Sequence, residues 1–427
     1  MSGTNGARVA IVNLGCRVNR VEADVIAAEL ERHGCRLVGE DEAEAIVVNT
    51  CAVTGEAEAK TRKTVRHAAL RPQRPVVVAT GCVANLFADE LRQLAENVVV
   101  QGNKAAVAAT VLERLGIAGD ASCADAVVSV TPTPTGRMRP GIKIQDGCDN
   151  RCTYCIVWKA RGRSRSMDAT EVVSRVRQSV SRGAREVVLT GINLGRFSAV
   201  GEDGRRVSLS GLLDLLLQET DVERVRLSSI EPPDVTDELL RTMAAGGERV
   251  APFLHVCLQS GCDATLRRMG RVYDTAFFSG VVDRARELVP GIALGTDLIV
   301  GFPGETDADF GESLAFCERM AFAKMHVFRY SRRPGTPAAT APGQVDPHVI
   351  ADRGRRMRDL AARMRHDQAG AHVGADELVV VQYPGRGVTG GLFDALVDPA
   401  YPLDSLVRVR ACAVLPDGTL DCTTQPA

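Results

Sequence analysis

The feature that most constrains this chain is the stretch from Gly147 to Cys155, which carries three cysteines in the spacing C-x3-C-x2-C. It directly follows an apolar, strand-like run at 141–145. Thiolates crowded this closely serve as metal ligands or form a disulfide, and a disulfide would leave the third cysteine over. A structural zinc ion takes four ligands, but no fourth Cys or His follows at short spacing. The spacing therefore favours an iron–sulfur cluster with one iron open to another ligand. A zinc site with a distant fourth ligand is the second choice.

Composition sets the broad class of the chain. Its 427 residues are enough for two or three domains, and 45% apolar with 25% charged residues is typical of a globular protein with full cores. The net charge of -1 indicates no particular partner. Thirteen cysteines is an odd number, and residues 1–6 lack the apolar segment of a signal peptide. We therefore expect a cytoplasmic protein whose cysteines serve metal binding or chemistry, with no membrane-spanning segment.

The segment 7–116 alternates between apolar runs and helical patterns. We expect strands at 8–14, 45–49, 75–79 and 97–100, and helices at 22–33 and 57–70, the second of them rich in Lys and Arg. Such alternation predicts a parallel sheet with helices on both faces.

Three cysteines of this segment share a position relative to the strands. Cys16, Cys51 and Cys82 each lie just past one of the first three expected strands. Because parallel strands carry ligands at their carboxyl ends, the three thiols can converge in space, which favours a second three-thiolate cluster. Cys is also a common buried small residue, and five others fit no pattern and are interpreted as incidental: Cys35, Cys123, Cys317, Cys412 and Cys422.

A weakly patterned, Pro- and Gly-containing segment at 117–140 is interpreted as a linker, and 141–345 as a second domain. This domain repeats strand then helix. Strands are expected at 142–145, 186–189, 224–227, 253–258, 292–300 and 325–330, and helices at 168–182, 209–219, 234–245, 275–289 and 306–320. Six such units favour a barrel or partial barrel over an open sheet, and in barrels the catalytic groups follow the strands.

Several polar residues stand where that rule expects ligand contacts. Gly191 and Asn193 follow the second strand, and Ser229 and Glu231 follow the third. The fourth strand carries His255 and leads to Gln259, and the fifth contains Asp297. Glu231 and Asp297 are candidates for binding ribose hydroxyls or an amino group, although lone carboxylates near strand ends are often solvated or cap a helix.

These features together resemble the radical S-adenosylmethionine methylthiotransferases. The cysteine loop after the first barrel strand is the signature of radical S-adenosylmethionine enzymes, and the N-terminal segment adds the motifs at 14–19, 49–54 and 80–82. Further matches lie at 144–148, 160–162, 229–232, 258–261, 295–297, 300–305 and 333–338. The form Gly15-Cys16-Arg17-Val18-Asn19 resembles the branch that modifies N6-threonylcarbamoyladenosine in tRNA.

The resemblance implies a mechanism and a set of ligands. Cys148, Cys152 and Cys155 would hold a [4Fe–4S] cluster that binds and cleaves S-adenosylmethionine, and Cys16, Cys51 and Cys82 would hold an auxiliary [4Fe–4S] cluster that carries or donates sulfur. A second S-adenosylmethionine would supply the methyl group. The expected contacts to S-adenosylmethionine are Tyr154, Gly191, Asn193, Ser229, Glu231, Gln259 and Asp297. The expected product is 2-methylthio-N6-threonylcarbamoyladenosine at position 37 of tRNA. The expected partners are tRNA, a sulfur donor and a reductant such as flavodoxin or ferredoxin. The protein itself is expected to be a monomer.

The remaining chain bears on the substrate. A basic helix is expected at 352–367, within a connector at 346–371, and short β-like runs at 377–382, 391–396 and 406–414 predict a small all-β barrel at 372–427. The resemblance places an RNA-binding, TRAM-like module there. Between Asp376 and Cys422, however, the sequence has only three basic residues and seven acidic ones. The resulting net charge of 3 − 7 = −4 disfavours binding to the phosphates of RNA. The fold class is therefore α/β: an N-terminal parallel sandwich, a partial (β/α)6 barrel and a C-terminal all-β barrel.

Three pairs of residues depart from the usual family pattern near the expected barrel mouth: Trp158 with Lys159, Cys257 with Cys262, and Arg329 with Arg332. They leave three hypotheses open. The first is methylthiolation of threonylcarbamoyladenosine in tRNA. The second is the same chemistry on a protein side chain, a peptide or a small molecule. The third is a non-catalytic iron–sulfur or zinc RNA-binding protein.

Overall fold

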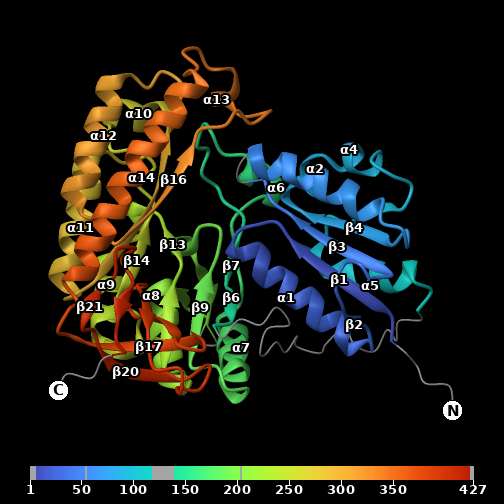
Figure 1. Ribbon diagram of the computed structural model, residues 1–427, viewed down its shortest axis with the longest axis horizontal. Helices are drawn as coiled ribbons and strands as arrows, with labels where there is room; N and C mark the ends of the chain where they lie inside the picture. The colour runs from blue at the N-terminus through green and yellow to red at the C-terminus, as the bar shows by residue number, and fades with distance from the viewer. Residues whose placement is uncertain (1–5, 53–54, 118–138, 202–203, 424–427) are drawn as a thin grey trace. The chain divides into compact units, whose positions relative to one another are not determined.

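The computed structural model describes residues 6–52, 55–117, 139–201 and 204–423 (Figure 1). The expected linker at 117–140 and Cys123 lie almost wholly outside these ranges. The chain divides into two compact units. The first comprises Met1–Arg137, Gly147–Asp149 and Cys155–Arg163, and the second comprises Met138–Asp146, Asn150–Tyr154 and Ser164–Ala427. None of the described helices is long and apolar enough to cross a membrane.

The first unit is built on a five-stranded parallel sheet in the order β2-β1-β3-β4-β5. The strands are β1 (Arg8–Asn13), β2 (Arg36–Leu37), β3 (Ala45–Thr50), β4 (Val76–Gly81) and β5 (Val98–Val100). The prediction of a parallel α/β sandwich is confirmed. The two-residue edge strand β2 escaped prediction because so short a run carries no periodicity.

Helices cover both faces of this sheet (Figure 1). Alternate residues of β3 explain why: Ile46 and Val48 pack with α2 (Gly55–Ala69), α3 (Cys82–Leu86) and α4 (Ala88–Arg92), whereas Ala45 and Val47 pack with α1 (Arg17–Arg32) and α5 (Val107–Arg114). A strand whose successive side chains are all apolar must be covered on both sides. The short helix α6 (Val157–Arg161) also packs in this unit, through Ile156 and Ala160.

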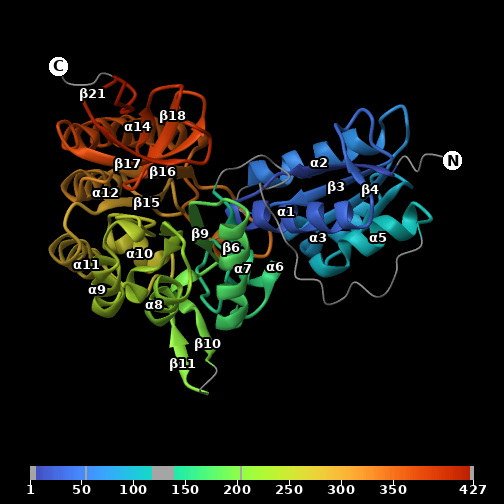
Figure 2. The same ribbon diagram turned by 90° about the horizontal axis from the view of Figure 1, so that it is seen from below.

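The second unit contains a partial barrel of six successive parallel strand positions. They are β6 (Gly141–Lys143), β9 (Glu186–Thr190), β12 with β13 (Arg224–Leu227, Ser229–Ile230), β14 (Phe253–Val256), β15 (Ala293–Val300) and β16 (Lys324–Arg329). The outer helices are α7 (Ala169–Ser181), α8 (Leu209–Glu219), α9 (Asp237–Ala245), α11 (Thr275–Leu288), α12 (Asp307–Met320) and α14 (Pro347–Gly370). Figure 2 shows α8, α9, α11 and α12 side by side on the outside of the strands. The predicted barrel is confirmed.

The smaller elements of this unit were less visible in the sequence. They are β7 (Gln145–Asp146) paired with β8 (Arg165–Ser166), the hairpin β10 (Ser198–Val200) and β11 (Arg206–Ser208), α10 (Asp263–Arg268) and α13 (Pro337–Thr340). Helix α9 begins at Asp237 rather than at 234, because Pro232 and Pro233 form a short 3-10 turn and the Thr236 hydroxyl caps the helix.

The C-terminal region forms a six-stranded sheet, in the order β20-β17-β18-β19-β22-β21, which confirms the all-β prediction. Its strands are β17 (Asp376–Tyr383), β18 (Arg386–Thr389), β19 (Asp394–Leu396), β20 (Leu406–Arg410), β21 (Ala413–Val414) and β22 (Leu420–Asp421). The strand expected at 391–396 is wrong in its first half. The chain turns there, with Leu392 at a φ of 67° and the Thr389 N–H bonded to the Phe393 carbonyl.

This C-terminal sheet packs against the amino ends of the barrel strands. Phe253 and Ala293, the first residues of β14 and β15, share one apolar core with Val379, Val381 and Phe393. The cysteine loop follows β6 at the opposite, carboxyl end. The sheet therefore closes the bottom of the barrel rather than its mouth.

A buried charged cluster fastens the C-terminal sheet to the barrel. Glu186 begins β9 and pairs with Arg224 and with Arg226, whose Nε lies 2.8 Å from the carboxylate. Burial would raise the pKa of Glu186, but the charges of Arg226 and Arg224 hold it well below its usual range. Arg224 also donates to the Leu378 carbonyl at 2.7 Å, and Arg226 donates to the Gly390 carbonyl at 2.7 Å.

Candidate functional site

The first candidate site lies at the carboxyl edge of the first unit's sheet. Cys16 stands at the N-cap position of α1 just after β1, Cys51 directly follows β3, and Cys82 begins α3 directly after β4. Because β1, β3 and β4 are neighbours in a parallel sheet, the three cysteines gather along one edge. Cys51 and Cys82 are buried and Cys16 is partly buried.

Polar side chains surround this edge and are fixed by one another. The Cys16 thiol donates to Asn19 Oδ1 at 3.3 Å, and Asn19 Nδ2 donates to the Thr50 carbonyl at 2.7 Å. Asn49 Nδ2 donates to the Asn19 carbonyl at 2.6 Å. Thr50 Oγ1 accepts from the N–H of Val83 at 3.1 Å and so holds the start of α3. The network orients the backbone that carries all three cysteines.

Two partly buried cations lie beside these cysteines. Arg161 lies 2.8 Å from one Glu22 oxygen and donates to Asn19 Oδ1 at 2.8 Å, while Lys104 lies 2.8 Å from the other Glu22 oxygen. Burial raises the pKa of the Cys16 thiol, and its hydrogen bond to Asn19 and the charge of Arg161 oppose that rise. Positive charge of this kind favours the thiolate form that iron requires.

The donor set fits an iron–sulfur cluster in a second respect. Asn13 Oδ1 and Thr80 Oγ1 are buried near the same edge and have no hydrogen-bond partner among the described residues. Buried polar atoms normally find a partner, so these two leave room for an added group. Three thiols beside two cations suit an anionic cluster better than a packed core.

The loop at 147–155 connects β7 to α6 and carries the other three cysteines. Gly147 has a φ of 73°, and a Cβ there would lie 2.0 Å from the Arg163 carbonyl oxygen, so only glycine fits. The Cys148 N–H donates to the Gly162 carbonyl at 3.1 Å. The loop is thereby tied back onto the end of α6.

In the second unit, Cys152 of the loop is buried against Arg271. Arg271 Nη1 donates to Cys152 Sγ at 2.9 Å, Nη2 donates to the Glu231 carboxylate, and Nε donates to Tyr273 Oη at 3.1 Å. Burial would lower the pKa of Arg271, but interactions with Tyr154, Tyr273 and Cys152 raise it above its usual value. A permanent cation therefore touches an expected cluster ligand.

A second group of titratable side chains lies inside the barrel. Asp297 of β15 is 3.0 Å from His255 Nε2 on β14 and 3.1 Å from His326 Nδ1 on β16. Burial would raise the pKa of Asp297, but the nearby imidazoles of His255 and His326, the latter hydrogen-bonded to it, hold it well below its usual range. Asp297 thus remains a carboxylate, which can bind an amino group or hydroxyls. His255, Cys257 and Asp297 also bring their ligand atoms within 4.8 Å of one another.

The remaining expected cofactor contacts lie at the carboxyl ends of the strands. Gln145 Oε1 accepts from the N–H groups of Ile192 and Asn193 at 2.9 and 2.8 Å, and a Cβ on Gly191 would lie 2.9 Å from that oxygen. Asn193 Oδ1 and Ser228 Oγ are buried without a hydrogen-bond partner among the described residues. These two atoms are free to accept or donate to a bound ligand.

Three more of the expected contacts have defined surroundings. Gln259 has a φ of 69°, and its backbone bonds to Asp297 and Ile299 on β15 at 2.9 Å each. Tyr154 packs edge-on against Phe302, with ring centroids 6.3 Å apart. Ser229 opens β13, beside His255 in register. The second unit thus brings Asp297 and His255 together, and Glu231 and Cys152 through Arg271.

Sequence reasoning missed several residues at both sites. Arg271, Lys104 and Glu22 fell outside the quoted motifs, and His326 was not singled out. Lys104 had a usable signal, since it follows β5 as the cysteines follow β1, β3 and β4. Arg271 gave none, because its contact with Cys152 spans 119 positions of sequence.

Comparisons with known proteins identify the family of the chain. Residues 142–317 match the Radical SAM superfamily, and residues 8–102 match "Uncharacterized protein family UPF0004". The chain is 34% identical over 432 residues to the threonylcarbamoyladenosine tRNA methylthiotransferase MtaB of Thermotoga maritima, covering 97% of this chain and 96% of that protein. It is 35% identical over 404 residues to the ribosomal protein uS12 methylthiotransferase RimO of Desulforudis audaxviator, covering 89% and 88%.

A solved structure supports the fold alone. The radical S-adenosylmethionine methyltransferase TsrM of Kitasatospora setae, with cobalamin and a [4Fe–4S] cluster bound, superposes with a TM-score of 0.54 at 16% identity. The match covers 78% of this chain and 77% of that one.

Proposed function

The chain belongs to the radical S-adenosylmethionine methylthiotransferases, and from that premise we propose that it methylthiolates carbon 2 of N6-threonylcarbamoyladenosine at position 37 of tRNA. The observation that carries the proposal is the similarity to the Thermotoga maritima enzyme over nearly the whole chain. The cofactors are two [4Fe–4S] clusters and S-adenosylmethionine, as in the family.

The residues present fit these groups. Cys148, Cys152 and Cys155 would hold one cluster, and Cys16, Cys51 and Cys82 would hold the other. When bound, the clusters and S-adenosylmethionine supply the electron, the hydrogen-abstracting radical, the sulfur and the methyl group. The chain itself binds, orients and shields the reacting groups.

The barrel residues each have a defined part in that task. Arg271 donates to Cys152 Sγ, and hydrogen bonds to cluster sulfurs and nearby positive charge tune a cluster's potential. Gln145 fixes the backbone at 191–193 and so places the spare acceptor Asn193 Oδ1 at the mouth. Asp297 offers a carboxylate for an amino group or ribose hydroxyls. The proposal also includes a separate sulfur donor and a reductant such as flavodoxin or ferredoxin.

One experiment tests the substrate. Nucleosides of tRNA from a strain lacking this gene would be analysed by mass spectrometry, and we expect 2-methylthio-N6-threonylcarbamoyladenosine to disappear while N6-threonylcarbamoyladenosine accumulates. Restoring the gene should restore the product. An unchanged amount of the methylthio nucleoside would contradict the assignment.

A second candidate keeps the chemistry but changes the substrate to a protein side chain or peptide. It is supported by the acidic C-terminal sheet and by the similarity to RimO. In that case tRNA nucleosides would be unchanged in the deletion strain, and a ribosomal or other protein would lose a methylthio group. The third hypothesis, a non-catalytic protein, is set aside by membership of an enzyme family.

A further inference from the structure

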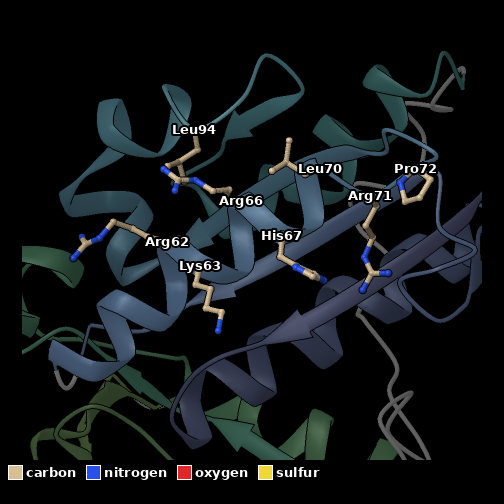
Figure 3. Close-up of a pocket in the computed structure, with 8 residues that line it drawn as sticks. All are labelled: Arg62, Lys63, Arg66, His67, Leu70, Arg71, Pro72 and Leu94. Carbon is tan, nitrogen blue, oxygen red and sulfur yellow. The ribbon is translucent and has the colours of Figure 1, made fainter.

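The second helix of the first unit presents a strongly basic surface that the chemistry above does not use. Helix α2 buries Val65, Ala68 and Ala69 against the sheet. Its outer side carries Arg62, Lys63, Arg66 and His67, here called the α2 basic face. Figure 3 shows these four side chains projecting from the helix, with Arg71 and Pro72 beyond its end.

The basic side chains of this face are not used to stabilise the fold. Among the described residues, Lys63, Arg66 and His67 have neither an ion pair nor a hydrogen bond from the side chain. Arg62 lies 3.6 Å from Glu90 in an exposed pair, which contributes little. Like charges spaced four apart, as in Arg62 and Arg66, destabilise a helix. The face therefore costs stability that a bound anion would return.

Several arginines of the other basic elements contrast with it. On α14, Arg355 pairs with Asp352 at 2.5 Å, Arg353 is buried with Glu305, and Arg365 pairs with Asp394 at 2.8 Å. In the C-terminal sheet, Arg408 pairs with Glu248 and Arg410 with Asp376. Each of these five arginines already neutralises a carboxylate, so none of them is as available to an anion as Lys63 and Arg66 of the α2 basic face.

The surface is also hollowed and partly apolar. The basic residues line an open hollow of ≈ 700 Å³ together with Leu70, Pro72 and Leu94. Leu70 is 61% exposed, which is unusual for a leucine at the end of an amphipathic helix. Arg71 is held at the rim by Glu40 and Asp41. Positively charged side chains beside exposed apolar side chains are complementary to a sugar–phosphate backbone, in which anionic phosphates alternate with less polar sugars.

We propose that the α2 basic face binds the sugar–phosphate backbone of the RNA substrate, and that it, rather than the acidic C-terminal sheet, supplies the phosphate contacts of this enzyme. The inference rests on the proposed function, because it takes RNA as the substrate. Sequence-independent phosphate contacts position an RNA without reading its bases.

The test measures binding of total tRNA from a deletion strain to full-length protein with both clusters reconstituted, over a range of salt concentrations. Arg66→Glu should weaken binding on the order of tenfold, and the slope of log affinity against log salt should fall by about 1. The double variant Lys63→Glu with Arg66→Glu should lose more of both. The matched control is Arg114→Glu on α5, an exposed arginine on the opposite face of the same sheet.

Two further measurements distinguish a loss of RNA binding from a general loss of folding or of cluster assembly. Iron content and formation of 5′-deoxyadenosine without RNA should be unchanged in all variants, whereas KM for tRNA should rise with little change in kcat for the α2 variants only. The inference is overturned if Arg66→Glu binds tRNA as tightly as Arg114→Glu does in an enzyme that modifies tRNA. If the unaltered enzyme neither binds nor methylthiolates tRNA, the proposed function fails and the inference falls with it.

Discussion

At the scale of single residues, Arg271 connects several parts of the second unit. One guanidinium touches the expected cluster ligand Cys152, the carboxylate of Glu231 and the hydroxyl of Tyr273. Tyr273 in turn donates to the carbonyls of Cys257 and Leu258. Because guanidinium has a rigid fork of donors, it can hold all three groups at once.

Replacing Arg271 with Gln should make the potential of the neighbouring cluster more negative and slow 5′-deoxyadenosine formation. The reason is the loss of a positive charge and of a donor to a cluster sulfur. Redox titration followed by electron paramagnetic resonance measures the potential. Arg267→Gln on α10, an exposed arginine without such contacts, is the control, and equal potentials in the two variants would contradict this role.

Gly147 gives a second prediction at this scale. Gly147→Ala should reduce iron bound by the loop, because its new Cβ would meet the Arg163 carbonyl oxygen at 2.0 Å in a left-handed conformation. Gly162→Ala is the matched control, since Gly162 also has a positive φ but nothing lies within 4 Å of the position that its Cβ would take. Iron assays should show a larger loss for Gly147→Ala; equal losses would mean that backbone strain alone matters.

At the scale of elements, the strand ends organise both sites, and this is what the sequence predicted best. The strand at 224–227 and the helix at 209–219 have the same bounds in the structure, because apolar periodicity and caps such as Ser208 are local signals. Long-range contacts carry no local signal, which is why Arg271 and His326 were missed. The turn at Leu392 was missed because a leucine at positive φ is rare.

The strand ends of the first unit also carry a prediction. Changing Cys16, Cys51 and Cys82 together to Ala should remove about half of the bound iron, given four irons in each cluster. The control is Cys35→Ala, which alters a buried cysteine of the same unit away from those strand ends. Iron and acid-labile sulfide assays measure the difference. Full iron content in the triple variant would refute the auxiliary cluster.

At the scale of the whole chain, the buried cluster around Glu186 couples the C-terminal sheet to the barrel. Glu186→Gln should lower the free energy of unfolding of the second unit by about 3–5 kcal/mol, because it leaves Arg224 and Arg226 buried without a counter-charge. Glu219→Gln, which breaks the exposed pair with Arg177, should cost only about 0–1 kcal/mol. Urea denaturation measures the free energy of unfolding of both variants. Similar decreases would show that the buried cluster stabilises the fold no more than an exposed ion pair does.

The same cluster predicts a dependence on pH. The pKa of Glu186 lies well below its ordinary value of 4.5 in the folded chain. The Glu186 carboxylate therefore contributes its full stabilisation above pH 4.5, the ordinary pKa that it has in the unfolded chain. This stabilisation is lost as the pH falls from 4.5 toward the lower pKa of the folded chain. The stability gap between the unaltered protein and Glu186→Gln should shrink between about pH 7 and about pH 3.5. A gap that stayed constant or widened on acidification would contradict this account.

The docking of the C-terminal sheet also has a consequence for how the chain is made. Arg224 and Arg226 leave the ribosome long before their carbonyl acceptors at Leu378, Thr389 and Gly390. Until those residues emerge, the nascent barrel holds two arginines with unmet donors and an uncovered apolar base at Phe253 and Ala293. A chain terminated before residue 389 would keep all six expected cluster cysteines but would leave Arg226 without two carbonyl acceptors and expose the apolar base of the barrel. The barrel therefore completes its buried hydrogen bonds and covers its apolar base only after the C-terminal sheet has been made.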